Sequence, residues 1–204
     1  MPFNLQHLQA GVLYWRNTNW PQDFHNQFYI DLAGHNEMGL FTGDWWPGIL
    51  QTLSSWRATW PRSFDFINER ALERLNLLQE LWVPVNDLPN DIIAIPEDAI
   101  QRVNPFINVI HEIKNVNSPV FTSKFCHFIS PKRFPVIDRK AMGLPFGNYI
   151  EYWQYVRDEW DNTENDVRND LIQHFAHEIG DHIFDGYPFY TKIAEICLIG
   201  RNNG

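Results

Sequence analysis

Cysteine and long apolar runs are scarce in this chain of 204 residues, and strand-like alternation of apolar and polar residues is absent. The two cysteines, Cys126 and Cys197, lack metal-ligand spacing, which predicts packing roles in a reducing compartment. No run of about 18 apolar residues occurs, and the N-terminus has no basic segment followed by an apolar one. We therefore expect a cytoplasmic protein with no membrane partner.

Several catalytic motifs are also missing. There is no Gly-rich phosphate loop followed by Lys and Ser or Thr, no Gly-x-Ser-x-Gly elbow and no dinucleotide fingerprint. These absences disfavour the corresponding nucleotide hydrolases, ester hydrolases and dinucleotide-dependent enzymes. The net charge of −9 and a pI near 5.3 argue against nonspecific binding to nucleic acid, although a focused basic site is compatible with both.

Apolar content of 44%, with 15% aromatic residues, is enough for one sizeable core, so 1–204 is expected to be a single domain. Apolar residues recur at helical spacing, and prolines and glycines divide the pattern. The sequence predicts an all-α fold of about nine or ten helices. The expected helical segments are 5–15, 24–32 ending at Gly34, 45–60, 64–82, a broken helix 97–103 and 105–114, 120–129, 139–142, 149–160, 167–179 and 188–200.

Cations concentrate in one window of this acidic chain, from Lys114 to Lys140. It contains six cations and one acid, Asp138, and therefore predicts an anion site, with phosphate the commonest biological candidate. An ordinary basic surface turn is the alternative. The six cations are Lys114, Lys124, Lys132, Arg133, Arg139 and Lys140.

The same window has recognisable local structure. Ser118-Pro119 is typical of a helix start, and Ser130-Pro131 of its end. The segment 134–137 is expected to be extended, since a residue before proline avoids the helical region. Asp138 then stands where an N-cap would begin a short helix at 139–142. This arrangement can bring the amine of Lys124 and the carboxylate of Asp138 into one cleft.

The pattern Ser-Lys-Phe-x-His-Phe-x-x-Pro-x-x-Phe-Pro-Val-x-Asp, at 123–138, resembles small bacterial proteins of the 8-oxoguanine DNA glycosylase fold, in the helix-hairpin-helix glycosylase superfamily. The resemblance implies two helical lobes, with the terminal helices 1–40 and 160–204 in one and the middle helices 44–150 in the other. It also implies that Lys124 attacks the sugar C1′ and that Asp138 assists. The segment 115–122 departs from the family's Leu-Pro-Gly-Val-Gly hairpin.

Other residues receive supporting roles on this interpretation, with no metal and no cofactor. Ser123 would cap a helix or touch a phosphate, and His127 would place substrate or transfer protons, unless it is a packed core residue. Phosphate contacts are assigned to Lys132, Arg133, Arg139 and Lys140. Trp45 and Trp46 cannot both face one core, so one of them is a candidate for stacking on a base, with core packing as the alternative.

Three functions stay open from the sequence. The first is a DNA N-glycosylase and AP lyase that excises an oxidised or otherwise modified guanine-type base. The second is an N-glycosidase acting on a free modified nucleoside or nucleotide of the deazaguanine type, which the acidic net charge and the absent hairpin glycines favour. The third is a catalytically silent module that binds a modified base or a partner protein. Relatives of this type occur in bacterial antiphage operons, so defence-operon partners are expected by association.

A rival metal site lies near the C-terminus. His174 and Glu178, or His177 and Asp181, are four residues apart on an expected helix and would be able to share an ion, with His182 close by. The His-Glu-x-x-His zinc signature is not present, because Asp181 takes the place of the second His. A solvated helix face is the simpler interpretation.

Overall fold

The computed structural model describes residues 2–115, 118–180 and 183–204. Over these ranges the chain has helices and turns but no strand, so the all-α prediction is confirmed. Within these described ranges there are 11 α-helices and two short 3-10 helices, η1 and η2. Their bounds are α1 Leu5–Arg16, α2 Asn26–Asn36, α3 Trp46–Ser55, α4 Phe64–Leu72, α5 Leu75–Asn86, η1 Ile92–Ala94, η2 Glu97–Ala99, α6 Ile100–Lys114, α7 Pro119–Ile129, α8 Arg139–Met142, α9 Tyr149–Asp161, α10 Asn165–Ile179 and α11 Phe189–Asn203.

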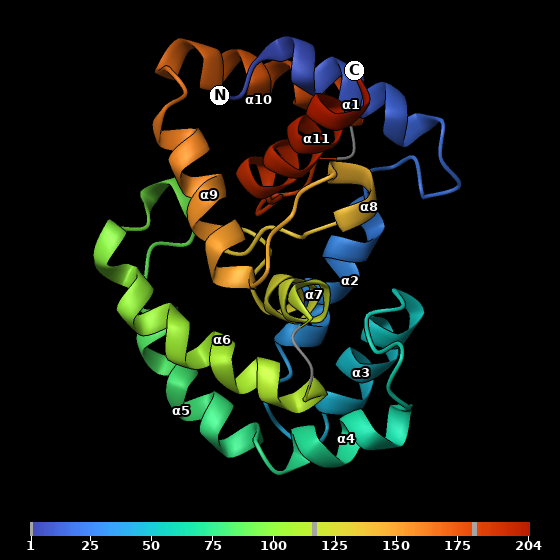
Figure 1. Cartoon of the computed structure of the whole chain (residues 1–204), viewed down its shortest axis with the longest axis vertical. Helices are drawn as coiled ribbons and strands as arrows, with labels where there is room; N and C mark the ends of the chain where they lie inside the picture. The colour runs from blue at the N-terminus through green and yellow to red at the C-terminus, as the bar shows by residue number, and fades with distance from the viewer. Residues whose placement is uncertain (1, 116–117, 181–182) are drawn as a thin grey trace.

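Figure 1 shows how the helices are arranged. Helices α1, α10 and α11 gather at one end of the molecule, while α3, α4, α5 and α6 occupy the other. Helix α7 lies between these groups, packing against α3, α6 and α9, and α8 packs against α11. The expected division into two lobes by residue number stays a prediction, because one hydrophobic core runs through both groups.

Glycine allows a close contact between α1 and α11. A Cβ on Gly11 of α1 would lie 1.9 Å from the carbonyl oxygen of Ile196, and a Cβ on Gly200 of α11 would lie 1.9 Å from that of His7. Real side chains do not tolerate such distances, so α1 and α11 approach to this extent only because both positions lack a Cβ. This contact ties the two ends of the chain together.

Several element boundaries differ from those expected. The segment 64–82 is two helices, α4 and α5, separated at Glu73 and Arg74 without a Pro or Gly signal. Helix α6 continues through Pro105, whereas the sequence predicted a break there, and α2 continues through Gly34, its predicted stop. Helix α5 also extends past residue 82, the predicted end of the segment 64–82, because it includes Pro84 and ends at Asn86.

Helix α3 ends earlier than predicted, at Ser55 rather than at residue 60. Arg57 adopts a left-handed conformation with φ of 55°, and the Ala58 N–H donates to the Leu53 carbonyl at 2.8 Å. This bond from two residues beyond the cap is a Schellman-type ending. The carbonyl of Trp56 is consequently outside the helix, and a side chain from α7 binds it.

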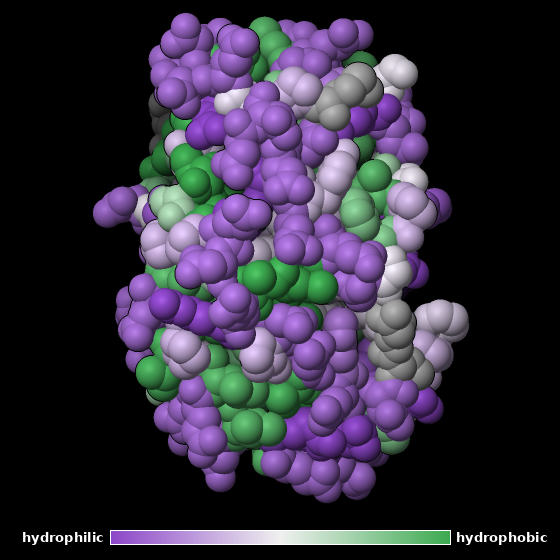
Figure 2. Space-filling model, turned by 60° about the vertical axis from the view of Figure 1, so that its left-hand side comes forward, coloured by the Kyte–Doolittle hydropathy of each residue, from purple (hydrophilic) through white to green (hydrophobic). Residues whose placement is uncertain are grey.

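The surface is largely polar between separate apolar areas. Figure 2 shows one face on which hydrophilic side chains predominate and hydrophobic ones appear in patches. No helix within the described ranges has both the length and the apolar character needed to cross a bilayer.

Candidate active site

Helix α7 supplies the central lysine, and its start is fixed locally. The Ser118 side chain accepts a hydrogen bond from the Phe121 N–H, and Pro119 occupies the first turn, as predicted. Most of α7 is buried, including Phe121, Phe125 and Phe128, while Lys124 is only partly covered. Residues 116 and 117 of the expected hairpin segment lie outside the described part of the chain. Lys124 is therefore positioned by a firmly packed helix.

The carboxylate of Asp138 is held by a second local device. Its Oδ1 accepts hydrogen bonds from the N–H groups of Lys140 and Ala141, each at 3.0 Å, so Asp138 is the N-cap of α8, as the sequence predicted. The segment just before Asp138 is attached to α7, because the Ser123 hydroxyl accepts a hydrogen bond from the Ile137 N–H at 3.2 Å. Ser123 is fully buried and contacts the backbone, a position that does not suit the predicted phosphate contact.

One pocket brings these groups together. Lys124 and Asp138 both line it, although they are 14 residues apart and come from different elements. Trp15, Trp20 and Trp56 contribute aromatic walls. The space, including its open mouth, is about 490 Å³. The complete lining is Tyr14, Trp15, Thr18, Trp20, His25, Trp56, Lys124, Val136, Asp138, Ala141, Glu195 and Ile199.

The amine of Lys124 bonds to the backbone, and no hydrogen bond joins it to Asp138 within the described residues. Its Nζ donates to the Trp56 carbonyl at 2.7 Å and lies 5.5 Å from the centre of the Trp56 ring. Burial lowers the pKa of Lys124, and the carboxylates of Asp138 and Glu195 act in the opposite direction. The amine thus lies in surroundings that favour its neutral, nucleophilic form relative to a free lysine.

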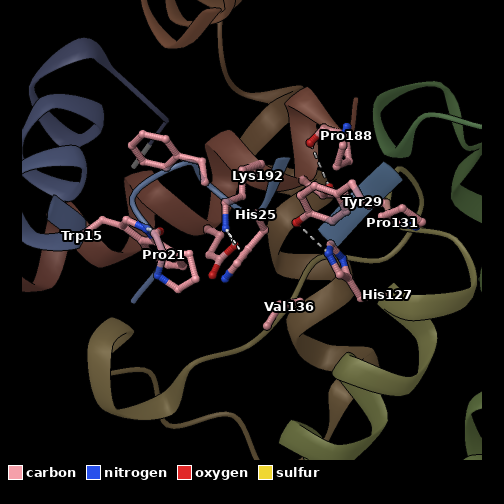
Figure 3. Close-up of polar contacts among 12 residues, drawn as sticks. Trp15, Pro21, His25, Tyr29, His127, Pro131, Val136, Pro188 and Lys192 are labelled. Atoms are coloured by element: carbon pink, nitrogen blue, oxygen red, sulfur yellow. Dashed lines mark hydrogen bonds and ion pairs between the residues drawn. The ribbon is translucent and has the colours of Figure 1, made fainter. Parts of the chain in front are cut away.

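The inner wall of the pocket carries a buried polar cluster. Lys192, which is 0% exposed, donates from Nζ to Glu195 Oε2 at 2.9 Å and lies 3.3 Å from His25 Nδ1. Its Nζ also lies 4.1 Å from the centre of the Trp15 ring. Figure 3 shows Lys192 between Trp15 and His25. Burial, with a further contribution from Lys192, lowers the pKa of His25 to about 2, so His25 is neutral.

His127 is a core residue of the kind the sequence left as the alternative. Its Nδ1 lies 2.6 Å from the Phe134 carbonyl, and its Nε2 lies 2.9 Å from the Tyr29 hydroxyl, as Figure 3 shows for the second contact. A carbonyl only accepts, so Nδ1 carries the proton and the Tyr29 hydroxyl donates to Nε2. Burial lowers the pKa of His127 to about 3. His127 therefore ties α7 to α2 and to the extended segment, and it does not line the pocket.

The base-stacking prediction for Trp45 and Trp46 needs correction. Both side chains are 0% exposed, and their indole N–H groups donate to the side chains of Asn36 and Asn68, respectively. Neither leaves a ring face for a ligand. Trp20 and Trp56 are the tryptophans at the mouth of the pocket.

The four predicted phosphate-binding cations are not brought together. Arg133 is buried and donates to the carbonyls of Asn86, Leu88 and Pro89, so its role is structural, contrary to the prediction. Arg139 donates to the Phe146 carbonyl. Lys132 lines a different hollow, and Lys140 lines the mouth next to Lys124 and Asp138. Of the four, Lys140 is the one at the candidate site.

The rival metal site has little support in the part of the chain that the structure describes. His174 Nε2 lies 3.9 Å from Glu178 Oε1, while Glu178 pairs with Arg16 at 2.9 Å. Among residues 2–115, 118–180 and 183–204, no group of three or more His, Cys, Asp or Glu side chains is placed to hold a metal ion. Asp181 and His182 lie outside these ranges.

Several pocket residues were not identified from the sequence. Trp20, His25 and Trp56 lie 68 or more residues before Lys124, and no local pattern connects them to it. A signal did exist for Lys192 and Glu195, because these two charges interrupt the mostly apolar segment 189–199 at a spacing of three residues. Buried charges of this kind are paired, and they often lie at functional sites.

Comparison of the chain with protein-family models, curated proteins and solved structures found no match.

Proposed function

We propose that this protein is an N-glycosylase with lyase activity that uses Lys124 as the nucleophile and Asp138 as the assisting carboxylate. The observation that carries the proposal is the shared pocket. Lys124 and Asp138 line one aromatic-walled pocket, and the Lys124 amine is partly buried there with a lowered pKa. A nucleophilic amine, a carboxylate and stacking surfaces are what displacement of a flipped base requires.

The proposed reaction has two stages, loss of the base and cleavage of the strand. The neutral Lys124 amine attacks C1′, the glycosidic bond breaks, and its electron pair leaves with the base. An amine proton passes by way of Asp138 to the departing base. The C1′–O4′ bond then breaks, O4′ takes up a proton, and a protonated imine joins Lys124 to C1′. Loss of a C2′ proton expels the 3′ phosphate, and water hydrolyses the imine to release the lysine.

The surroundings of the mouth favour a nucleic-acid strand as the substrate. Arg57 lines the mouth beside Lys140 and also lines a neighbouring hollow with Trp60 and Arg62. Trp60 is 78% exposed, which is unusual for a tryptophan. Exposed aromatic rings between cations are suited to unpaired bases and phosphates. We therefore favour a strand that continues from the pocket past Arg57 towards Trp60.

A second candidate is an N-glycosidase acting on a free modified nucleotide, and the net charge of −9 favours it. Repulsion between an acidic protein and a polyanion is reduced when the substrate carries a single phosphate. Salt separates the two candidates, because strand binding weakens steeply with ionic strength and nucleotide turnover does not.

The test is release of base and borohydride trapping on single- and double-stranded oligonucleotides that contain 8-oxoguanine or an abasic site. We expect base release and a reduced covalent adduct with wild-type protein, both lost in Lys124→Ala and retained in the control Lys132→Ala, since Lys132 lines a different hollow. Base release from free nucleotides without any adduct would favour the second candidate. No base release from either substrate class would reject both enzymatic proposals and leave a binding module.

A further inference from the structure

A buried histidine in the pocket has a polar atom that no described residue contacts by a hydrogen bond. His25 is 5% exposed, and its Nε2 lies in the interior without a hydrogen bond from the described residues. The ring lines the same pocket as Lys124 and Asp138. An unsatisfied buried polar group costs about 1–3 kcal/mol, so a retained one calls for an explanation.

The tautomer of His25 follows from its neighbour. The Lys192 ammonium, which is paired with Glu195, can only donate, so His25 Nδ1 at 3.3 Å must accept. Since the imidazole is neutral, its proton is on Nε2. The unpartnered atom is therefore a hydrogen-bond donor, and the molecule that satisfies it must supply an acceptor.

The orientation of the ring is fixed by its surroundings. The His25 ring packs against Trp56 at 4.7 Å and Trp15 at 5.1 Å between ring centres. Its backbone has a φ of 65°, a conformation that few residues other than glycine adopt, and the Asp23 carboxylate accepts from its N–H at 3.0 Å. The donor is thus held in one direction and does not depend on a mobile side chain.

An acceptor lies in the same wall. Glu195 lines the pocket, with one carboxylate oxygen occupied by Lys192. The wall consequently offers one N–H donor and one carboxylate acceptor. A base edge with a carbonyl oxygen next to a ring N–H, as in guanine and its oxidised forms, complements this pair, whereas an edge without the ring N–H does not.

We infer that His25 Nε2 and Glu195 are the base-recognition pair, reading the carbonyl and ring N–H of a lactam edge, and that Lys192 is the positioning residue that fixes both. The inference rests on the proposed function in that the ligand is a nucleobase. It assigns the reading of the base to residues other than those that carry out the displacement. Lys192 contacts both His25 and Glu195, which is 5% exposed, and so holds their side chains in the positions that the base requires.

The experiment is a tryptophan-fluorescence titration of the full chain with 2′-deoxyguanosine and with O6-methyl-2′-deoxyguanosine, which lacks the N1–H and the carbonyl. We expect the wild-type protein to bind deoxyguanosine about tenfold more tightly than its O6-methyl derivative. His25→Phe should remove this preference, and His25→Gln, which restores an N–H donor, should recover part of it. The matched control is His111→Phe, since His111 also has an unpartnered Nε2 but lines none of the pockets described above.

Two further measurements keep the outcomes distinct. In Lys124→Ala the preference for deoxyguanosine should persist although adduct formation is lost. The titration therefore tests base recognition even if the proposed covalent chemistry proves wrong. If His25→Phe does not fold, the NMR resonance of the His25 Nε2–H in the wild-type protein is measured instead. This resonance should shift when deoxyguanosine is added and should not shift when O6-methyl-2′-deoxyguanosine is added. Equal affinity for the two nucleosides, or a preference that survives in a folded His25→Phe, would overturn the inference.

Discussion

At the scale of single residues, the proposed chemistry depends on the protonation of Lys124. Burial is the largest influence on its pKa and lowers it, while Asp138 raises it by stabilising the ammonium. The amine is reactive above its pKa, so adduct formation should increase with pH and level off below the value expected of an ordinary lysine. Asp138 thus assists the reaction and also opposes deprotonation of the Lys124 ammonium.

Replacing Asp138 by Asn separates these effects. Asn still accepts the N-terminal N–H groups of α8, so the cap and the local fold should be kept. We expect the midpoint of the pH profile for trapping on an abasic duplex to move to lower pH, and the maximum rate to fall about 100-fold or more. A midpoint that stays in place or moves upward would show that Asp138 does not act on the Lys124 amine.

Ser123 provides a second test at this scale, with a stability readout. Ser123→Ala leaves the buried Ile137 N–H without its acceptor, which should cost about 1–3 kcal/mol in the free energy of unfolding. The same change should lower the rate of adduct formation, because the segment that ends in Asp138 loses its attachment to α7. Urea unfolding together with trapping checks both effects. Full stability with normal trapping would contradict the positioning of Asp138 through Ser123.

At the scale of elements, replacement of glycine by alanine should have opposite effects in two helices, α1 and α2. Gly11→Ala places a methyl group against the Ile196 carbonyl and should destabilise the protein by more than about 2 kcal/mol. Gly34→Ala, in the interior of α2, meets nothing within 4 Å and should stabilise it by about 0.5–1 kcal/mol. Thermal unfolding of both variants checks the pair. A neutral Gly11→Ala would mean that the two helices do not approach this closely.

The elements also show how far local sequence signals extend. Ser118-Pro119 and Asp138 gave correct helix starts, because a cap depends on residues within one turn. The early end of α3 was missed, since it depends on the left-handed conformation of Arg57. Such helix ends usually have glycine at this position, and this sequence has none there. The continuation of α6 through Pro105 was missed for a related reason: tertiary packing of its apolar face outweighs one lost hydrogen bond.

The candidate site divides in the same way. Lys124 and Asp138 were accessible to sequence reasoning, since both belong to one short motif. His25 and Trp56 were not, because only the packing of the chain around α7 brings them to that motif. Trp45 and Arg133 illustrate the converse, since their residue types suggested binding and their burial excludes it.

At the scale of the whole molecule, two neutral buried histidines make stability sensitive to acid. The folded-state pKa values are about 2 for His25 and about 3 for His127, below the ordinary value of 6.5 in each case. The unfolded chain therefore takes up protons first as the pH falls. Their contribution to stability is complete above about pH 6.5 and is progressively lost between that pH and the folded-state values.

Urea denaturation at pH 7 and pH 5 measures this effect. We expect the free energy of unfolding to be lower at pH 5 by about 2 kcal/mol for each histidine, since each unit of pH is worth about 1.4 kcal/mol per proton. His127→Phe should remove its own contribution of about 2 kcal/mol to this difference while lowering stability at pH 7. Equal stability at the two pH values would show that these histidines accept protons in the folded state.

Lys124 as the nucleophile must form a covalent bond to the substrate sugar, and the position of that bond on the protein can be determined. After borohydride reduction on an abasic-site oligonucleotide, proteolysis and mass spectrometry identify the modified lysine. We predict that the adduct lies on Lys124, in a protein that also contains Lys114, Lys132, Lys140 and Lys192. An adduct on any of those four, or none on wild-type protein that binds the oligonucleotide, would contradict the account.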